Sequence, residues 1–152
     1  MNDDVVLNTK TGERGTIAAW VDLFAQVWQQ PKERLDRMLA LLDEQVALES
    51  PMQRVVGRAA ARQDYLRILR ALPDLTGVLN SWEHRNGYLF IDMSLEASIG
   101  GRMVKWPSID RIRFRDGIAV ERVAYYDPQP VHRAFMRNPK GWSQYARLQA
   151  GV

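Results

Sequence analysis

In the first half of the chain, apolar positions recur every three or four residues, which is the period of an amphipathic helix. One stripe begins after Thr16 and consists of Ile17, Trp20, Phe24, Val27 and Trp28. A second follows Pro31, whose fixed backbone suits the first turn of a helix, and a third follows Gly57. These two stripes contain Leu35, Met38, Leu39 and Leu42, and then Ala61, Tyr65, Ile68, Leu69 and Leu72. We therefore expect three helices, with a short strand over residues 46–52 between the second and the third.

In the second half, apolar and polar positions alternate, which is the period of a strand with one buried face. Residues 88–99 alternate most regularly, and we also expect strands over residues 78–83, 103–114 and 118–126. The pairs between these segments are typical of tight hairpins, namely Asn86-Gly87, Gly100-Gly101 and Asp116-Gly117. A short helix over residues 131–136 completes the pattern. Helices followed by an antiparallel meander predict an α+β domain whose helices cover one face of the sheet.

The length of 152 residues is that of one domain, and 46% hydrophobic with 26% charged residues is ordinary for a globular protein. We expect a loose polar arm over residues 1–15, a single domain over 16–136 and a C-terminal tail over 137–152. The sequence contains no apolar run of membrane-spanning length and no charged-then-apolar leader, so we expect a cytoplasmic protein without a membrane partner.

The sequence lacks the residues that several kinds of functional site require. With no cysteine there is no thiolate nucleophile or cysteine metal site, and the two histidines, His84 and His132, lie far apart. We also find no glycine-rich nucleotide motif, and therefore expect neither a metal nor a cofactor. The net charge is +3, and Arg111, Arg113 and Arg115 alternate with apolar residues as on a solvated strand face. The alternative is a phosphate-facing stripe with steep salt dependence, but we expect no nucleic-acid partner.

Four short motifs occur in a particular order: residues 46–51 (VALESP), 57–60 (GRAA), 109–117 (IDRIRFRDG) and 125–128 (YYDP). Their order and spacing resemble the nuclear-transport-factor-2-like superfamily, most closely its SnoaL-like and ketosteroid-isomerase-like branches, over about residues 16–136. This resemblance implies a cone-shaped, curved antiparallel or mixed sheet that encloses an apolar pocket together with the three helices. It also implies a homodimer through the outer sheet face. For the tail over residues 137–152, packing near the pocket mouth and packing on the outside both remain open.

Strand alternation and the resemblance together predict which side chains face the pocket. The expected ligand-binding residues are Trp28, Phe24, Ser50, Met93, Leu95 and Trp106. For the tryptophans, stacking on a flat ligand and plain core packing both remain open. The expected catalytic residues are Asp110, Arg122 and Tyr126. Tyr126 either donates a hydrogen bond to a carbonyl or is a tyrosine with a solvated hydroxyl at the sheet edge.

Asp110 interrupts an otherwise apolar inward row, where a carboxylate must be paired, protonated or used. In ketosteroid isomerases the matching position holds a protonated acid that donates to the substrate oxyanion. Here Arg122 departs from that pattern, because a neighbouring guanidinium favours the ionised carboxylate. Asp110 is then either an acid/base or half of a buried pair that fixes strand register. Ser50 stands where those enzymes carry their aspartate base, so ketosteroid isomerisation itself is not expected.

The function that these residues predict is that of a cofactor-free isomerase, cyclase or hydrolase. It would act by proton transfer on a small hydrophobic carbonyl or polyketide-like compound. The alternative is a non-catalytic module of the same fold that binds a small ligand or a protein.

Overall fold

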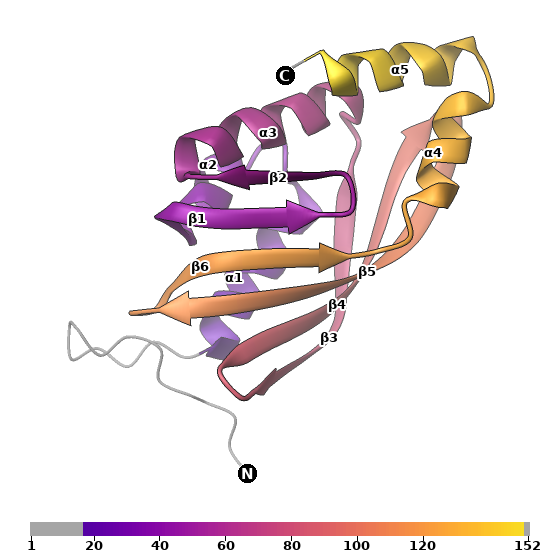
Figure 1. Cartoon of the computed structure of the whole chain (residues 1–152). Helices are drawn as coiled ribbons and strands as arrows, with labels where there is room; N and C mark the ends of the chain where they lie inside the picture. Colours follow the sequence, from indigo (N-terminus) through magenta and orange to yellow (C-terminus); the bar gives the residue numbers. More distant parts are fainter. Residues whose placement is uncertain (1–16, 151–152) are drawn as a thin grey trace.

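Helices and strands fill most of residues 17–150, the part of the chain that the computed structural model describes (Figure 1). The arm predicted over residues 1–15 lies outside the described residues. The elements in chain order are α1 (Ile17–Gln29), α2 (Leu35–Ala40), β1 (Leu42–Ser50), β2 (Gln53–Val56), α3 (Arg58–Ala71), β3 (Thr76–Arg85), β4 (Tyr88–Ile99), β5 (Arg102–Arg115), β6 (Ile118–Tyr125), α4 (Gln129–Met136) and α5 (Pro139–Gln149). Within this part of the chain, no helix is long and apolar enough to span a membrane.

The strands form one six-stranded sheet in the order β2-β1-β6-β5-β4-β3. Neighbouring strands are antiparallel, except that β1 runs parallel to β6. Both residues of each predicted hairpin pair have a positive φ, from 53° at Asn86 and Asp116 to 82° at Gly101. This backbone geometry matches the twist of an antiparallel pair. The predicted α+β fold, with a curved mixed sheet, is confirmed.

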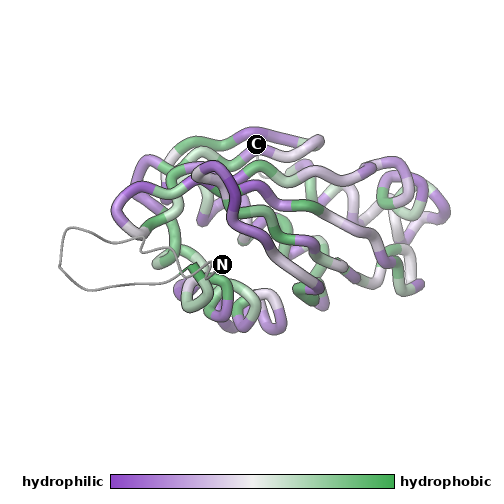
Figure 2. The backbone as a smooth tube through the Cα atoms, turned by 90° about the horizontal axis from the view of Figure 1, so that it is seen from below, coloured by the Kyte–Doolittle hydropathy of each residue, from purple (hydrophilic) through white to green (hydrophobic). Residues whose placement is uncertain are grey.

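The inward faces of the long strands are also as predicted. Along β4 every second residue from Leu89 to Ile99 is buried, and Trp106, Ser108, Asp110 and Ile112 are buried on β5. Figure 2 shows the resulting alternation of apolar and polar positions along the strands. Opposite pairs such as Met93 and Ser108 lie on one face of the sheet.

Helices close the concave face of this sheet. In Figure 1, α1 lies behind the strands and α3 runs above β2, with α5 beside it. On α1, the rings of Trp20 and Phe24 stack 5.0 Å apart, and Trp20 also meets the edge of Phe114 on β5 at 5.0 Å. Each fully buried large side chain, such as Phe24 or Met93, contributes about 1.5–3 kcal/mol to stability. The core therefore lies between the sheet and the three N-terminal helices.

The second helix is shorter than its apolar stripe predicts. It ends at Ala40, and β1 begins at Leu42 instead of residue 46. Leu42 pairs with Ala119 of β6, and its carbonyl accepts hydrogen bonds from Nε (3.0 Å) and Nη2 (2.6 Å) of Arg58. Pairing within the sheet thus overrides the helical period. The pattern does not predict the strand β2 either. Pro51, at the end of the strand expected over residues 46–52, lies in the turn between β1 and β2.

The predicted C-terminal tail contains a helix, α5, that packs on α3 and α4. Asn138 caps it, because its Oδ1 accepts from the Gly141 backbone N at 2.9 Å while its Nδ2 donates to the Gly100 carbonyl at 2.9 Å. The Gln144 side chain accepts from Gly100 N (2.7 Å) and donates to Ser98 O (2.9 Å). These hydrogen bonds fasten α5 to the hairpin between β4 and β5.

Gly141→Ala tests how closely α5 packs. A Cβ atom at Gly141 would collide with the backbone carbonyl of Phe135. Backbone atoms within the fold cannot move aside as the end of a flexible side chain can. We expect the free energy of unfolding to fall by about 1–3 kcal/mol in urea denaturation followed by circular dichroism. The control, Lys140→Ala at an exposed neighbouring position, should change it by less than about 0.5 kcal/mol. Equal stability of Gly141→Ala and the parent would contradict this close docking of α5.

Candidate functional site

A cavity of about 670 Å³ lies between the concave sheet face and the helices. This volume is within the range of pockets that hold small organic molecules. Apolar side chains from α1, α3, α4 and the sheet form most of its wall, including Trp28, Leu48, Leu72, Leu95, Trp106 and Phe135. Leu148 and Gln149 bring the end of α5 into the lining as well.

An ion pair lies beside this apolar wall. Arg122 on β6 donates to Asp110 Oδ2 on β5 through Nε at 2.7 Å and Nη2 at 2.6 Å. The Ser108 hydroxyl donates to the other carboxylate oxygen at 3.3 Å. Asp110 is fully buried and absent from the cavity lining, whereas Arg122 lines the cavity. The structure thus brings together the two predicted residues, with the guanidinium between the carboxylate and the cavity.

Tyr65 on α3 completes this cluster. Arg122 Nη1 donates to the Tyr65 hydroxyl oxygen at 2.8 Å, so the phenol keeps its own proton for donation. The Arg122 guanidinium also lies over the rings of Phe24 (5.3 Å) and Trp28 (5.1 Å). These ring faces attract the cation and shield it from water. Tyr65 was not among the predicted site residues because it occupies a position in the apolar stripe of its helix.

Burial and the cluster set the protonation of these groups. Burial raises the pKa of the Tyr65 phenol above its ordinary value, although Arg122 opposes the shift. Burial alone would lower the pKa of the Arg122 guanidinium, but Asp110 and Tyr65 outweigh burial and raise it. At neutral pH, Tyr65 is therefore a neutral hydrogen-bond donor beside a permanent cation.

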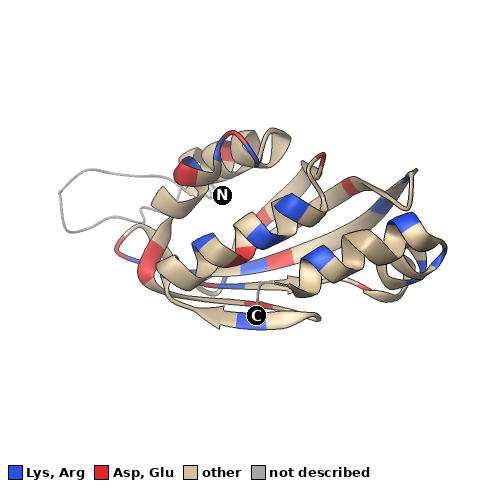
Figure 3. Cartoon of the chain, turned by 90° about the horizontal axis from the view of Figure 1, so that it is seen from above, with Lys and Arg blue, Asp and Glu red and all other residues tan. Residues whose placement is uncertain are grey.

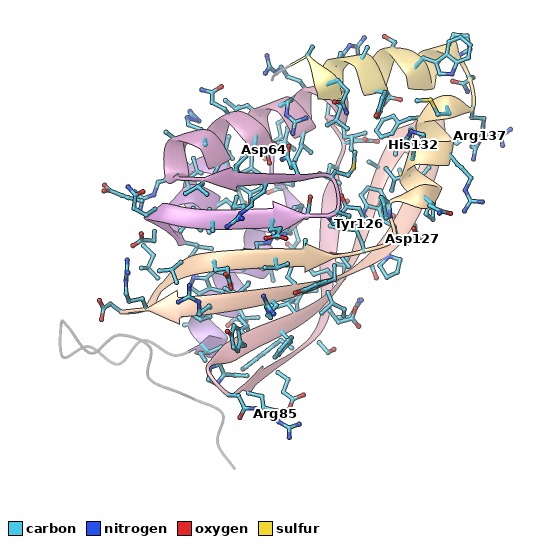
Figure 4. All side chains as sticks on the ribbon, viewed as in Figure 1. Asp64, Arg85, Tyr126, Asp127, His132 and Arg137 are labelled. Atoms are coloured by element: carbon cyan, nitrogen blue, oxygen red, sulfur yellow. The ribbon has the colours of Figure 1, made fainter. Side chains whose placement is uncertain are left out.

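Tyr126 and Ser50 form a second polar contact in the cavity wall. Tyr126 follows β6, as Figure 4 shows, and Ser50 is the last residue of β1. Burial raises the pKa of Tyr126, and a hydrogen bond between its hydroxyl and that of Ser50 partly offsets this. Both residues line the cavity.

A third polar group, not predicted from the sequence, lies on α3 (Figure 4). Arg67 Nη2 donates to Asp64 Oδ1 at 2.5 Å and also to Gln53 Oε1 on β2, while Nη1 donates to the Leu148 carbonyl on α5. Asp64 and Arg67 are each only 9% exposed, and both line the cavity. On the sequence they share a helix side with Gln63, which is typical of a solvated face. Only the packing of β2 and α5 over that side buries them.

The predicted site residues therefore divide into two sets. Those that line the cavity are Trp28, Ser50, Leu95, Trp106, Arg122 and Tyr126. Those that lie fully buried behind its wall are Phe24, Met93 and Asp110. Among residues 17–150, no group of three or more His, Cys, Asp or Glu side chains is placed to hold a metal ion.

The outer sheet face carries the arginine row. Arg111 and Arg113 each approach Glu121 at 3.8 Å, and Arg115 approaches Asp43 at 3.6 Å. All three arginines thus have an acidic neighbour within the chain. Elsewhere, Lys and Arg positions occur on several helices and strands (Figure 3).

Comparison with known proteins identifies the family. The SnoaL-like domain family matches residues 17–122, and no match was found among curated protein sequences. Among solved structures, a protein of Jannaschia sp. CCS1, provisionally named a SnoaL-like polyketide cyclase, aligns with a TM-score of 0.70 and 16% identity. The alignment covers 84% of this chain and 99% of that one.

Two further structures share the fold. TerC, co-crystallised with polyporic acid, aligns with a TM-score of 0.67 and 12% identity, over 76% of this chain and 96% of its own. A ketosteroid-isomerase-like protein of Catenulispora acidiphila DSM 44928, in complex with trimethylamine, aligns with a TM-score of 0.64 and 13% identity, over 71% and 85%. Identities this low establish the fold alone. Because the family match spans well over half of the chain, the chain belongs to the SnoaL-like domain family and has the nuclear-transport-factor-2-like, ketosteroid-isomerase-like fold.

Proposed function

We propose that this chain is a cofactor-free enzyme that binds a small, largely apolar carbonyl compound and assists proton transfer within it. The observation that supports this most directly is the pairing of Arg122 with Tyr65 at the wall of an apolar cavity. Isomerisation and cyclisation of polyketide-like compounds are reactions of this class. The names of the related cyclase structure and of TerC with polyporic acid agree with such a ligand.

The chemical argument rests on where charge develops. When a proton leaves the carbon beside a carbonyl group, negative charge moves onto the carbonyl oxygen. Tyr65 has a proton to donate to that oxygen, and Arg122 polarises it by donating to the same hydroxyl. Donors that are already oriented in a site of low dielectric stabilise this charge more than they stabilise the neutral ground state.

Asp110 serves in this proposal to orient Arg122. Its Oδ2 accepts two hydrogen bonds from Arg122, its Oδ1 accepts one from Ser108, and its side chain does not line the cavity. Because the pair is neutral overall, it gives a permanently anionic ligand little net attraction. A neutral carbonyl compound fits this electrostatic balance better than a carboxylate or phosphate.

The alternative function is ligand binding without turnover. It is favoured by the position of Asp110 behind the wall and by Ser50, which has no basic group of its own. Under this alternative, the Arg122–Tyr65 pair would hold a carbonyl oxygen that does not react.

We further propose a homodimer through the outer sheet face. Phe90, Ile109 and Tyr125 are 38%, 42% and 49% exposed on β4, β5 and β6. Register pairing places Ile109 beside Tyr125, and the Arg111 guanidinium lies over the rings of Tyr88 (5.2 Å) and Tyr125 (5.8 Å). Apolar side chains grouped with aromatic and arginine residues are typical of protein interfaces, and a two-fold dimer would bring the same patch of two copies together.

Binding of 2-naphthol tests the role of Tyr65, because this planar molecule carries a hydroxyl where an enol would. Its binding should change the tryptophan fluorescence, since Trp28 and Trp106 line the cavity. We expect Tyr65→Phe to weaken binding about 2- to 10-fold through loss of one hydrogen bond. The control is Tyr88→Phe on the outer face, which should bind as the parent does. Unchanged affinity in Tyr65→Phe would remove Tyr65 from the site.

Asp110→Asn tests the ion pair. It leaves the buried Arg122 guanidinium without its counter-charge, so we expect a loss of about 3–5 kcal/mol in the free energy of unfolding. Replacing both residues, Asp110→Asn with Arg122→Met, should restore much of that loss. Asp92→Asn, on the opposite sheet face, is the control and should have little effect. A single Asp110→Asn variant as stable as the parent would rule out the pair as a fold determinant.

Sedimentation equilibrium tests the dimer. The parent should sediment as a dimer, and Ile109→Glu should shift it towards monomer, because a carboxylate would be buried in an apolar interface. Leu23→Glu, a matched substitution at a 49% exposed position on α1, should leave the dimer intact. A parent that is monomeric at high concentration would refute the proposed interface.

A further inference from the structure

The cavity holds a second carboxylate, Asp64, that the proposed function leaves without a role. Asp64 lies on α3 directly before Tyr65, and both side chains line the cavity. It is 9% exposed and ion-paired with Arg67. A carboxylate in such a place is either a structural partner of the arginine or a group that acts on the ligand.

The hydrogen bonds of Asp64 leave one oxygen free. Arg67 Nη2 binds Oδ1 at 2.5 Å, and none of the hydrogen bonds found among residues 17–150 involves Oδ2. Arg67 is itself held by Gln53 and by the Leu148 carbonyl, so the carboxylate is anchored to β2 and α5 through one arginine. The anchor orients Asp64 while Oδ2 keeps its lone pairs.

We propose that Asp64 is the catalytic base that removes a proton from the carbon beside the ligand's carbonyl group, with Oδ2 as the accepting atom. This inference rests on the proposed function, because it supplies the proton acceptor that the Arg122–Tyr65 oxyanion site requires. Ser50 cannot serve without a base of its own, and Asp110 has both oxygens engaged and no place in the lining.

Asp64 and the two phenols belong to one electrostatic environment. Burial raises the pKa of Tyr126, and the negative charge of Asp64 adds to this shift. Burial likewise raises the pKa of Tyr65, with Asp110 and Asp64 adding to it. Asp64, Tyr65 and Tyr126 all line the same cavity, so the proton acceptor and the hydrogen-bond donors border one space.

The step balances without an oxidant or a cofactor. The C–H bond breaks and its proton goes to Asp64 Oδ2. The electron pair forms a C=C bond, and the π pair of the carbonyl group moves to oxygen, which Tyr65 stabilises by donation. Return of the proton from Asp64 to the same carbon gives exchange, and return to a conjugated carbon gives isomerisation. Because carboxylates are weak bases, the ligand should carry a C–H bond activated by a second unsaturated group.

The probe for this step is 2-tetralone, whose C1 lies between a carbonyl group and an aromatic ring. Nuclear magnetic resonance in deuterium oxide measures the loss of its C1 protons. We expect the parent to accelerate exchange and Asp64→Asn to lower the protein-dependent rate by about 100-fold or more. Asp64→Asn should still bind 2-naphthol, because that ligand needs the donors and not the base. Asp36→Asn, an exposed carboxylate on α2, is the matched control and should exchange at the parent rate.

A double variant separates catalysis from packing. Asp64→Asn alone leaves Arg67 without its carboxylate and should lower the melting temperature. Adding Arg67→Met removes the uncompensated charge and should raise the melting temperature again, as in other replacements of buried pairs. If Asp64 is the base, exchange stays lost in the double variant although stability recovers.

The results of these experiments distinguish a failure of the role of Asp64 from a failure of the proposed function. Exchange at the parent rate in Asp64→Asn, or its recovery in the double variant, would overturn the role of Asp64 and leave the proposed function standing. A parent that binds 2-naphthol but does not accelerate exchange would overturn both the proposed proton transfer and the role of Asp64, in favour of binding without turnover. Loss of exchange in both variants, with naphthol binding retained, supports Asp64 as the base.

Discussion

The buried contact between Arg122 and Asp110 is the interaction on which the rest of the cavity depends. Taking a guanidinium and a carboxylate out of water is unfavourable, and only close hydrogen bonding between them offsets the cost. The two residues lie on neighbouring strands, with Asp110 opposite Ala124 and Arg122 opposite Ile112. A side chain as long as arginine spans that diagonal. A shift of one residue between β5 and β6 would place the carboxylate on the outer face and leave the guanidinium unpaired. Trp106 and Ser108 point inward on the same face of β5, and the remaining guanidinium nitrogen of Arg122 donates to Tyr65. One charge pair thus joins two strands and a helix.

The polar groups of the cavity differ in how completely they are satisfied. Both carboxylate oxygens of Asp110 accept hydrogen bonds, from Arg122 and from Ser108, and its side chain does not line the cavity. Tyr65 accepts one hydrogen bond and keeps one to give, and Asp64 uses only one oxygen. Both ion pairs are neutral overall, so the interior has directional donors and acceptors without a strong net charge. Such an interior favours an uncharged ligand with a polar group that can use these donors and acceptors.

The sequence predicted the sheet better than the site. The sheet pattern depends on residues that are neighbours in the chain, whereas the site depends on contacts between remote segments. Alternation along residues 88–99 and the turn pairs such as Asn86-Gly87 depend on neighbours in the chain, and the structure follows them. The inward placement of Trp106, Arg122 and Tyr126 follows from the same alternation. Leu42 fits the helical stripe, and its strand partner, Ala119, is remote in sequence. Asp64 and Arg67 could not be identified as site residues from the sequence, because their burial depends on β2 and α5, neither of which the pattern predicted. Phe24 and Met93 are fully buried and lie outside the cavity lining, since alternation gives the face of a residue but not its depth.

The parallel pairing of β1 with β6 also bears on how the protein assembles. Residues 47–49 join residues 121–123 only after most of the chain has been made, since the meander and α3 lie between them in sequence. Contacts between such remote segments form slowly, because a long loop must close before they add stability. The cavity wall contains both strands together with the end of α5, so no early hairpin of the meander encloses it. A binding-competent cavity should therefore be among the last features to form during refolding. The appearance of ligand binding during refolding would then mark the completion of the native state.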